Sequence, residues 1–360
     1  MSAVSGLAET QEIVRREPLL PDLALLLDAE ALSDALGSPV RIERLRYKPG
    51  SSTVVSLRDR AGRAFWAAAH ADPAKIAKHA RRAARLGASA TPIGHAALSA
   101  PAVADRALAR GIEEAALASS SGEVLRYNPF RRLVVRSGGH VVKASAREQD
   151  VRVPERLAAR GIPVLVPRRL GARATTTTWW GEGDLASVPS PTAARAAGRA
   201  LAALHRVPVD DPPLAAPSRS EVVAGAMDAI RAILPDAAES AGDVAAEAGC
   251  AASSRHAGLV HGDLSPDQVL VRAGVIRIID LDRASRGEPE RDLGAFLAAG
   301  GDEALVDGYR EAGGAPDADA IRAWRAIAHL QRAVEPFRTA LPGWPQAVRA
   351  EIAAAREVLG

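Results

Sequence analysis

The chain is poor in residues on which several common chemistries depend. Cys250 is the single cysteine among 360 residues, which excludes an intrachain disulfide and a zinc site built from cysteines. Aromatic residues make up 3% of the chain, so Ala, Leu and Val have to fill its cores. No apolar run approaches the roughly 20 residues that span a bilayer, and residues 1–16 show no secretory signal. We therefore expect a soluble cytoplasmic protein of two or three domains.

Lysine is also scarce, because nearly all of the basic residues are arginine. The formal net charge of +3 is small for 360 residues, so the composition predicts neither a nucleic-acid partner nor a membrane partner. Lysine occurs only at Lys48, Lys75, Lys78 and Lys143. A chain with this preference can keep a lysine where a compact point charge is needed.

The most informative stretch runs from Leu259 to Asp282. Two short β-branched or aliphatic segments flank Gly274, which predicts a hairpin with a turn at that glycine. Asp263 precedes the first segment, and Asp280 and Asp282 follow the second. The hairpin is expected to gather these acids beside one cleft. Because like charges repel, such a cluster indicates a bound cation or a proton-donating substrate.

Three motifs in this region occur in order at suitable spacing. The run from His261 to Gln268 resembles an H-G-D-x-x-x-x-N loop, with Gln268 in place of the usual Asn. Residues 279–282 resemble an I-D-x-D strand, and residues 292–294 read D-L-G. The chain is thereby similar to the aminoglycoside phosphotransferase and choline kinase-like family, small-molecule relatives of protein kinases. The resemblance implies an α+β, bilobal protein kinase-like fold with a small antiparallel-sheet amino lobe and a mainly helical carboxyl lobe.

An internal repeat precedes these motifs. Residues 46–49 (R-Y-K-P) and 126–129 (R-Y-N-P) are each followed by a strand, a glycine turn, a second strand and a helical segment. Two copies indicate two sheet-plus-helix units rather than a solenoid. We predict an N-terminal cap over residues 1–120 that resembles a degenerate amino lobe, a nucleotide-binding amino lobe over 121–182, and a helical catalytic and acceptor-binding lobe over 183–360.

The resemblance assigns nucleotide binding to the second copy of the repeat. Lys143 occupies the strand position of the lysine that holds nucleotide phosphates, paired with Glu155 or, as a less favoured choice, Glu148. The alternative is a solvated edge-strand lysine. The turn between the first two strands lacks glycine. Arg131 or Arg132 can bind phosphate there as a fork, or both are ordinary surface charges.

The resemblance also implies roles for the catalytic motifs. Asp263 would accept the proton of the acceptor hydroxyl, and His261 would brace the loop. Gln268 and Asp280 would hold magnesium ions through oxygen, although the longer Gln side chain repositions the second site. Asp282 would contact metal or acceptor.

Other segments carry weaker signals. Asp292 can cap a helix from Leu293 to Ala299, and His205 is expected to be structural. In this family the adenine lies against backbone groups of a hinge, here residues 181–184. The acidic residues between positions 209 and 247 form either a wall that favours a cationic acceptor or an ordinary solvated helical face.

Three functions remain open. The leading one is transfer of the γ-phosphoryl group of ATP, or GTP, to a hydroxyl of an aminoglycoside, amino sugar, choline-like amine or sugar. The second is a nucleotide-binding pseudokinase or regulatory protein without transfer activity, which the Gln268 departure and the missing glycine loop favour. The third is a metal-dependent hydrolase that uses the acid cluster and gives Lys143 no role.

Overall fold

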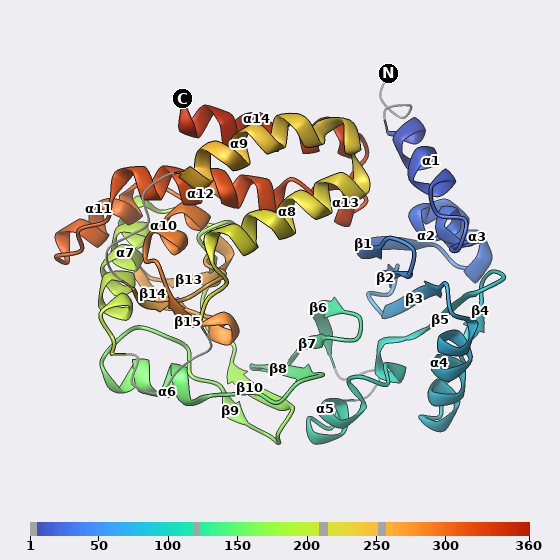
Figure 1. Ribbon diagram of the computed structural model, residues 1–360. Helices are drawn as coiled ribbons and strands as arrows, with labels where there is room; N and C mark the ends of the chain where they lie inside the picture. The colour runs from blue at the N-terminus through green and yellow to red at the C-terminus, as the bar shows by residue number, and fades with distance from the viewer. Residues whose placement is uncertain (1–5, 118–121, 209–214, 251–256) are drawn as a thin grey trace. The chain divides into compact units, whose positions relative to one another are not determined.

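The computed structural model describes residues 6–117, 122–208, 215–250 and 257–360. Its contacts divide the chain into two compact units, which are described separately (Figure 1). The first unit comprises residues 1–149, 168–179 and 335–347, and the second comprises residues 150–167, 180–334 and 348–360. The division into cap, amino lobe and helical lobe at the boundaries given above stays a prediction.

The first unit is built from antiparallel strands with short helices between them. Its helices are α1 (Leu7–Arg15), α2 (Leu23–Leu27), α3 (Ala29–Leu36), α4 (Pro73–Arg85), the 3-10 turn η1 (Ala102–Ala104), α5 (Ala109–Glu114) and α13 (Glu335–Arg338). Its strands are β1 (Val40–Lys48), β2 (Ser52–Asp59), β3 (Ala64–His70), β4 (Thr91–Pro92), β5 (Ala97–Pro101), β6 (Glu123–Asn128), β7 (Arg132–Ser137), β8 (His140–Ser145), β9 (Arg168–Arg169) and β10 (Ala174–Thr178).

The two sheets of this unit have the same topology. Their strand orders are β1-β2-β3-β5-β4 and β6-β7-β8-β10-β9. In each sheet the first three strands are neighbours in chain order, and the fifth strand lies between the third and the fourth. In the first sheet Val54 pairs with Ala68, and in the second Val134 pairs with Lys143. Ala68 therefore occupies the position of Lys143, and it is fully buried. The repeat read from the sequence is thus a repeat of whole sheets, and the first copy has no lysine at this position.

A buried acid upstream of each sheet fixes the turn after its first strand. Glu17 accepts hydrogen bonds from the Tyr47 hydroxyl and from the backbone amide that follows that strand. Asp105 likewise accepts hydrogen bonds from the Tyr127 hydroxyl, at 3.0 Å, and from the backbone amide of Phe130, at 2.6 Å. The sequence analysis missed both acids, because neither lies within the repeated R-Y-x-P segment. They explain why the Tyr recurs in both copies.

One hydrophobic cluster joins the two sheets of the first unit. Trp66 and Ala68 from the first sheet lie in the same cluster as Tyr127, Leu133 and Ala144 from the second. Helix α4 contributes to the cluster, and the ring of its His79 packs against Trp66 and Phe130. The scarcity of aromatics is offset here by alanines, as the composition suggested.

The second unit is mainly helical. Its helices and helical turns are α6 (Arg152–Ala159), α7 (Pro191–His205), α8 (Arg219–Ile233), η2 (Pro235–Ala237), α9 (Ala238–Cys250), η3 (Pro266–Gln268), η4 (Leu281–Arg283), α10 (Glu290–Ala298), α11 (Ala304–Glu311), α12 (Ala318–Arg332) and most of α14 (Trp344–Leu359). Its strands are β11 (Gly183–Asp184), β12 (Gly258–Val260), β13 (Val269–Arg272), β14 (Val275–Ile278) and β15 (Ser285–Gly287).

Glycines set how closely two of these helices pack. A Cβ added at Gly198 of α7 would lie 1.9 Å from the carbonyl oxygen of Leu305 in α11. A Cβ at Gly308 of α11 would lie 1.9 Å from the carbonyl oxygen of Arg195 in α7. The two backbones are therefore in direct contact, which only residues without a Cβ permit. This contact places the end of α7 beside α11.

The α+β class predicted from the sequence is confirmed by these elements. Within the described part of the chain, no helix combines the length and the apolar composition that crossing a bilayer requires.

Candidate functional site

The predicted hairpin is present and carries the site motifs. Strands β13 and β14 pair antiparallel from Val269 opposite Ile278 to Arg272 opposite Val275. The connecting residues Ala273 and Gly274 have φ values of 46° and 78°, as a two-residue turn between twisted strands requires. Strand β12 pairs with β15 and leads into the loop that begins at His261. The hairpin thus brings the H-G-D loop and the residues after β14 to one region of the second unit.

Asp292 is the residue that fixes the H-G-D loop. Its carboxylate is fully buried and accepts hydrogen bonds from the backbone amides of His261, at 2.6 Å, and Gly262, at 2.9 Å. A third hydrogen bond, at 3.0 Å, comes from Nε2 of His205. Burial alone would raise the pKa of Asp292, but the hydrogen bond and charge of His205, the charge of His261 and the Gly262 amide outweigh it, so that its pKa lies below the ordinary value.

The prediction that Asp292 caps a helix beginning at Leu293 is wrong. Helix α10 begins at Glu290, after Pro289, and Asp292 lies within its first turn. A capping residue has non-helical backbone and bonds to amides of its own helix. Asp292 is helical, and its oxygens are already used by the loop and by His205.

His205 and Tyr309 support Asp292 from the other side. His205 ends α7, and its Nδ1 lies 3.0 Å from the hydroxyl of Tyr309 on α11. Because an ionised carboxylate only accepts, Nε2 of His205 donates to Asp292. Burial, followed by the charges of Glu290 and Asp292, raises the pKa of Tyr309 to about 12. The hydroxyl is therefore protonated and available as a donor at neutral pH.

The loop itself depends on His261 and Gly262. His261 is fully buried; its Nε2 lies 2.8 Å from the carbonyl oxygen of Ile279, and its Nδ1 lies 3.4 Å from the amide of Asp263. Gly262 has a φ of 82°, and a Cβ there would lie 2.4 Å from the carbonyl oxygen of Arg283. Only glycine fits such a backbone position without strain. The geometry aims the Asp263 side chain out of the loop, where about half of its surface is exposed.

Arg283 is a site residue that the sequence analysis missed. Its Nη1 lies 3.1 Å from Oδ1 of Asp263, and 63% of the Arg283 side chain is exposed. It follows Asp282 immediately, so the I-D-x-D motif pointed to its neighbourhood but not to a role.

The candidate metal ligands lie around the hairpin. Gln268 is buried, and its backbone oxygen accepts from the amide of Ile279 at 3.0 Å, which places it beside the start of the second motif. Its side-chain amide donates to Asp267 at 3.3 Å, leaving the side-chain oxygen as the possible ligand. Asp280 has a φ of 61°, a conformation that non-glycine residues rarely adopt and that clusters at functional sites. Asp282 is exposed.

These ligands suit a hard cation. Amide and carboxylate oxygens are the donors that magnesium prefers, and magnesium commonly uses one or two carboxylates together with substrate phosphates and water. Within the described residues, no group of three or more His, Cys, Asp or Glu side chains is placed to hold a metal ion. Asp263, Asp280 and Asp282 therefore do not form the three-carboxylate metal cluster that the hairpin suggested, and Asp263 instead pairs with Arg283.

The candidate nucleotide-binding residues fall in both units. Lys143 lies on β8 of the first unit, opposite Val134 and Thr175 in the sheet, and Glu155 lies in the first turn of α6 in the second. Their pairing stays a prediction, as does the less favoured pairing of Lys143 with Glu148.

Arg131 and Arg132 lie where the turn joins β7. The amide of Arg131 donates to the carbonyl of Asn128, and the neighbouring amide of Phe130 is bonded to Asp105. The backbone amide of Phe130 is therefore not available to bind phosphate. The arginine side chains remain as the candidate phosphate ligands of this turn.

Several acidic residues of α8, η2 and α9 have partners within the unit. Asp236 pairs with Arg349 at 2.6 Å and Asp243 with Arg356 at 3.3 Å, while Glu221 forms a capping box at the start of α8. Asp210 and Asp211 lie outside the described residues. These contacts favour the solvated-face interpretation over a wall that selects a cationic acceptor.

The comparisons with known proteins identify one family and one fold. A model of the phosphotransferase enzyme family matches residues 111–330, more than half of the chain. The choline/ethanolamine kinase family protein of Mesorhizobium loti is 16% identical, with a TM-score of 0.50 over 69% of this chain and 93% of its own. A putative aminoglycoside phosphotransferase of Ralstonia eutropha is 17% identical, with a TM-score of 0.48 over 70% of this chain and 97% of its own. No curated protein gave a significant match. The protein kinase-like fold expected from the motifs is confirmed.

Proposed function

Since the chain belongs to the phosphotransferase enzyme family, we propose that it transfers the γ-phosphoryl group of ATP or GTP to a hydroxyl of a small molecule. The enzyme class is that of a small-molecule kinase with an alcohol group as acceptor. The observation that carries the proposal is the H-G-D loop, whose backbone Asp292 fixes by two amide hydrogen bonds. A group that orients an attacking hydroxyl has to be held rigidly, because phosphoryl transfer depends mainly on positioning and charge stabilisation.

Asp263 is the proposed catalytic residue. It accepts the proton of the acceptor hydroxyl as that oxygen attacks phosphorus, and the nucleoside diphosphate leaves. Arg283 lies 3.1 Å from the same carboxylate. We infer that Arg283 holds this side chain in the orientation from which it meets the hydroxyl, an interaction that exposure to solvent keeps weak enough to be replaced.

The remaining roles follow from position and chemistry. Lys143 binds the nucleotide phosphates as a point charge, with Glu155 orienting it, and Arg131 and Arg132 supply further donors to phosphate. Gln268 and Asp280 would hold magnesium, with Asp282 near it or near the acceptor. When bound, magnesium neutralises the charge of the nucleotide phosphates.

The acceptor is the least specified part of the proposal. The similarity to the choline/ethanolamine kinase family protein of Mesorhizobium loti makes amino alcohols such as choline one candidate class, and aminoglycosides, amino sugars and neutral sugars are the others. Asp236 in η2 and Asp243 in α9 pair with arginines, so these two acids give no preference for a cationic acceptor. A neutral sugar is therefore tested together with the amines in the first set of acceptors.

The test is phosphoryl transfer measured by phosphorus NMR and by nucleoside diphosphate release. Full-length protein is incubated with ATP or GTP, magnesium and each acceptor class. With an accepted substrate, Asp263→Asn is expected to lower kcat by about 10²- to 10⁴-fold, the usual contribution of a positioned base. Asp319→Asn is the matched control, because Asp319 is an exposed residue of α12 in the same unit.

Three outcomes would contradict the proposal. Transfer that Asp263→Asn leaves unchanged would remove the assigned base. Nucleotide binding by calorimetry without turnover on any acceptor would favour the pseudokinase alternative instead. Turnover that needs metal but no nucleotide would favour a hydrolase.

A further inference from the structure

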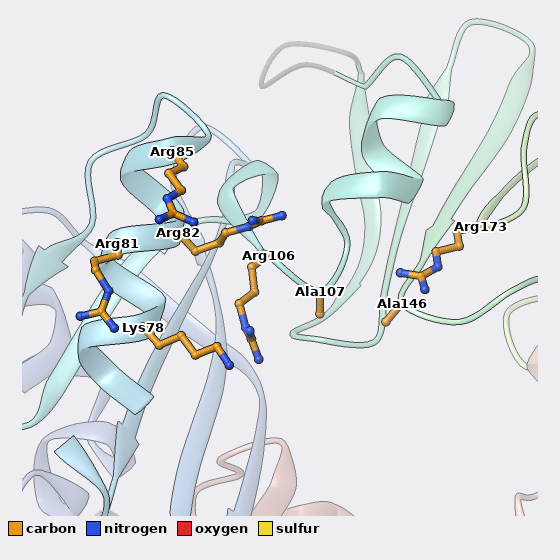
Figure 2. Close-up of a pocket in the computed structure, with 8 residues that line it drawn as sticks. All are labelled: Lys78, Arg81, Arg82, Arg85, Arg106, Ala107, Ala146 and Arg173. Carbon is orange, nitrogen blue, oxygen red and sulfur yellow. The ribbon is translucent and has the colours of Figure 1, made fainter. Parts of the chain in front are cut away.

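The first unit contains a concave site, formed by elements outside the H-G-D region. It is a cavity of about 630 Å³ whose wall carries two alanines and a set of cationic side chains (Figure 2). The cations are Lys78, Arg81, Arg82, Arg85, Arg106 and Arg173. Four of them come from α4, one follows the 3-10 turn η1, and one directly precedes β10. Three separate segments therefore contribute positive charge to one cavity.

None of these six side chains has an ion-pair partner among the residues that the structure describes. Two nearby carboxylates are already occupied. Asp105, next to Arg106 in the chain, accepts from Tyr127 and from two backbone amides. Glu114 pairs with Arg110 and accepts the backbone amide of Arg173. Asp105 offsets part of the charge of Arg106, but neither acid forms an ion pair with any of the six cations, so most of their mutual repulsion remains.

Arg173 gives an independent sign of a missing partner. Its Nε atom is buried, yet within the described part of the chain it has no hydrogen-bond partner. Figure 2 shows this side chain extending toward Ala146, and Lys78 and Arg106 extending toward each other. A buried donor without an acceptor costs free energy that an anion in the cavity would recover.

Stabilisation of α4 does not account for the cluster. Arg82 and Arg85 lie in the last turn of that helix, where cations interact favourably with the helix dipole. Lys78 and Arg81 lie before the last turn, and the effect falls off within one turn. Arg106 and Arg173 belong to other segments.

The cavity is also distinct from the expected nucleotide-binding face. Ala144 of β8 is buried in the hydrophobic cluster that joins the two sheets, and Ala146, which lines the cavity, packs against the same cluster. Because side chains alternate along a strand, Lys143 points to the opposite face from Ala144. The cavity therefore adds a site rather than extending the one around Lys143.

We propose that this cavity binds a small molecule that carries three or more phosphate groups. Its volume of about 630 Å³ lies in the range of about 300 to 1,000 Å³ typical of small-molecule sites. A phosphate ester carries a charge of about −1.5 to −2 at neutral pH, so three such groups balance the six cations. Arginine forks match phosphate oxygens in geometry as well as charge.

The probe for this site is inorganic triphosphate, titrated into the full-length protein by calorimetry with EDTA present. We expect saturable binding that Arg82→Glu and Arg106→Glu each weaken by about tenfold or more, since each removes charge-assisted hydrogen bonds and adds repulsion. Arg60→Glu is the matched control: it makes the same charge change at an exposed position between β2 and β3. That variant is expected to bind within twofold of the wild type.

Two further measurements separate this site from the catalytic one. Lys143→Ala and Asp263→Asn are expected to keep the triphosphate affinity of the wild type, whether or not either changes phosphoryl transfer. The proposal is overturned if Arg106→Glu and Arg60→Glu bind equally well, or if Lys143→Ala abolishes binding. Binding to RNA or to anionic lipid vesicles without binding to triphosphate would likewise overturn it, because the ligand would then be a macromolecule or a surface.

Discussion

Replacing Asp292 by Asn is expected to release the H-G-D loop from the helical unit. The wild-type carboxylate accepts buried hydrogen bonds from the amide of His261 and from His205 and a partly buried one from the amide of Gly262. Asn has one acceptor oxygen, and its amide group would face a donor. At least one buried donor is therefore left without an acceptor.

The magnitude follows from the number and kind of these bonds. Hydrogen bonds to a charged group contribute about 1.5 to 3 kcal/mol each, so the three together bound the effect at about 4.5 to 9 kcal/mol. Relaxation of the loop lowers this, and removing one partner of a buried charged network typically costs about 3 to 5 kcal/mol. Each 1.36 kcal/mol changes an equilibrium constant about tenfold. The loop of the variant is therefore expected to open locally about 100- to 5,000-fold more often than that of the wild type.

Hydrogen exchange measured by mass spectrometry reads this opening directly. The peptide that contains the amides of His261 and Gly262 should lose protection in Asp292→Asn by the stated factor. Asp307→Asn, on a partly exposed residue of the same unit that pairs with Arg195, should leave that peptide unchanged. Exchange within threefold of the wild type in Asp292→Asn would refute the reasoning, because it would mean that the carboxylate does not hold the loop.

The pH dependence supplies a second measurement on the same pair of proteins. The folded-state pKa of Asp292 is lowered, so its stabilising contribution is fully present above the unfolded value of about 3.9. It is lost as the pH falls through the still lower folded value. Asp292→Asn has no such titration, so the difference in loop protection between wild type and variant should shrink only below about pH 4.

Three further predictions concern packing and charge elsewhere. Gly198→Ala is expected to destabilise the second unit by more than about 2 kcal/mol in chemical denaturation, because the new Cβ meets backbone, whereas Gly225→Ala in open space on α8 should be neutral or stabilising. Gly262→Ala should lower phosphoryl transfer and loop protection together, since φ is +82° and Arg283 blocks the Cβ; full activity would contradict this. The pKa of Asp105 is raised by burial, against its hydrogen bonds, from 3.8 to about 6, so the folded first unit binds the extra proton. The stability of the first unit should therefore fall by up to about 3 kcal/mol as the pH rises from about 4 to above 6. Chemical denaturation at several pH values would measure this dependence, and Asp105→Asn should remove it.

Much of the local structure could be predicted from the sequence because it depends on neighbours in the chain. The β-branched and aliphatic segments on either side of Gly274 gave the hairpin. The repeated R-Y-x-P segments gave two similar sheets. The H-G-D motif located Gly262 and Asp263, since a loop of this kind is specified by residues that are adjacent in sequence.

The roles of several side chains could not be predicted because their partners are distant in sequence. Asp292 resembled a helix cap, yet it bonds His205, which lies 87 residues earlier. Glu17 and Asp105 gave no signal until the turn amides and Tyr hydroxyls they bind were seen in space. Arg283 became a site residue only through its approach to Asp263.

The sequence by itself determined the α+β class, the order of the elements and the chemical groups available for phosphoryl transfer. Only the tertiary structure decided which of those groups are buried, which are paired and which are left to face a cavity. The physical reason is that backbone periodicity is set by nearest neighbours, whereas hydrogen bonding, ionisation and unbalanced charge depend on whatever the fold brings within a few ångströms. The six cations around the cavity of the first unit show this, since they come from three segments that no local pattern connects.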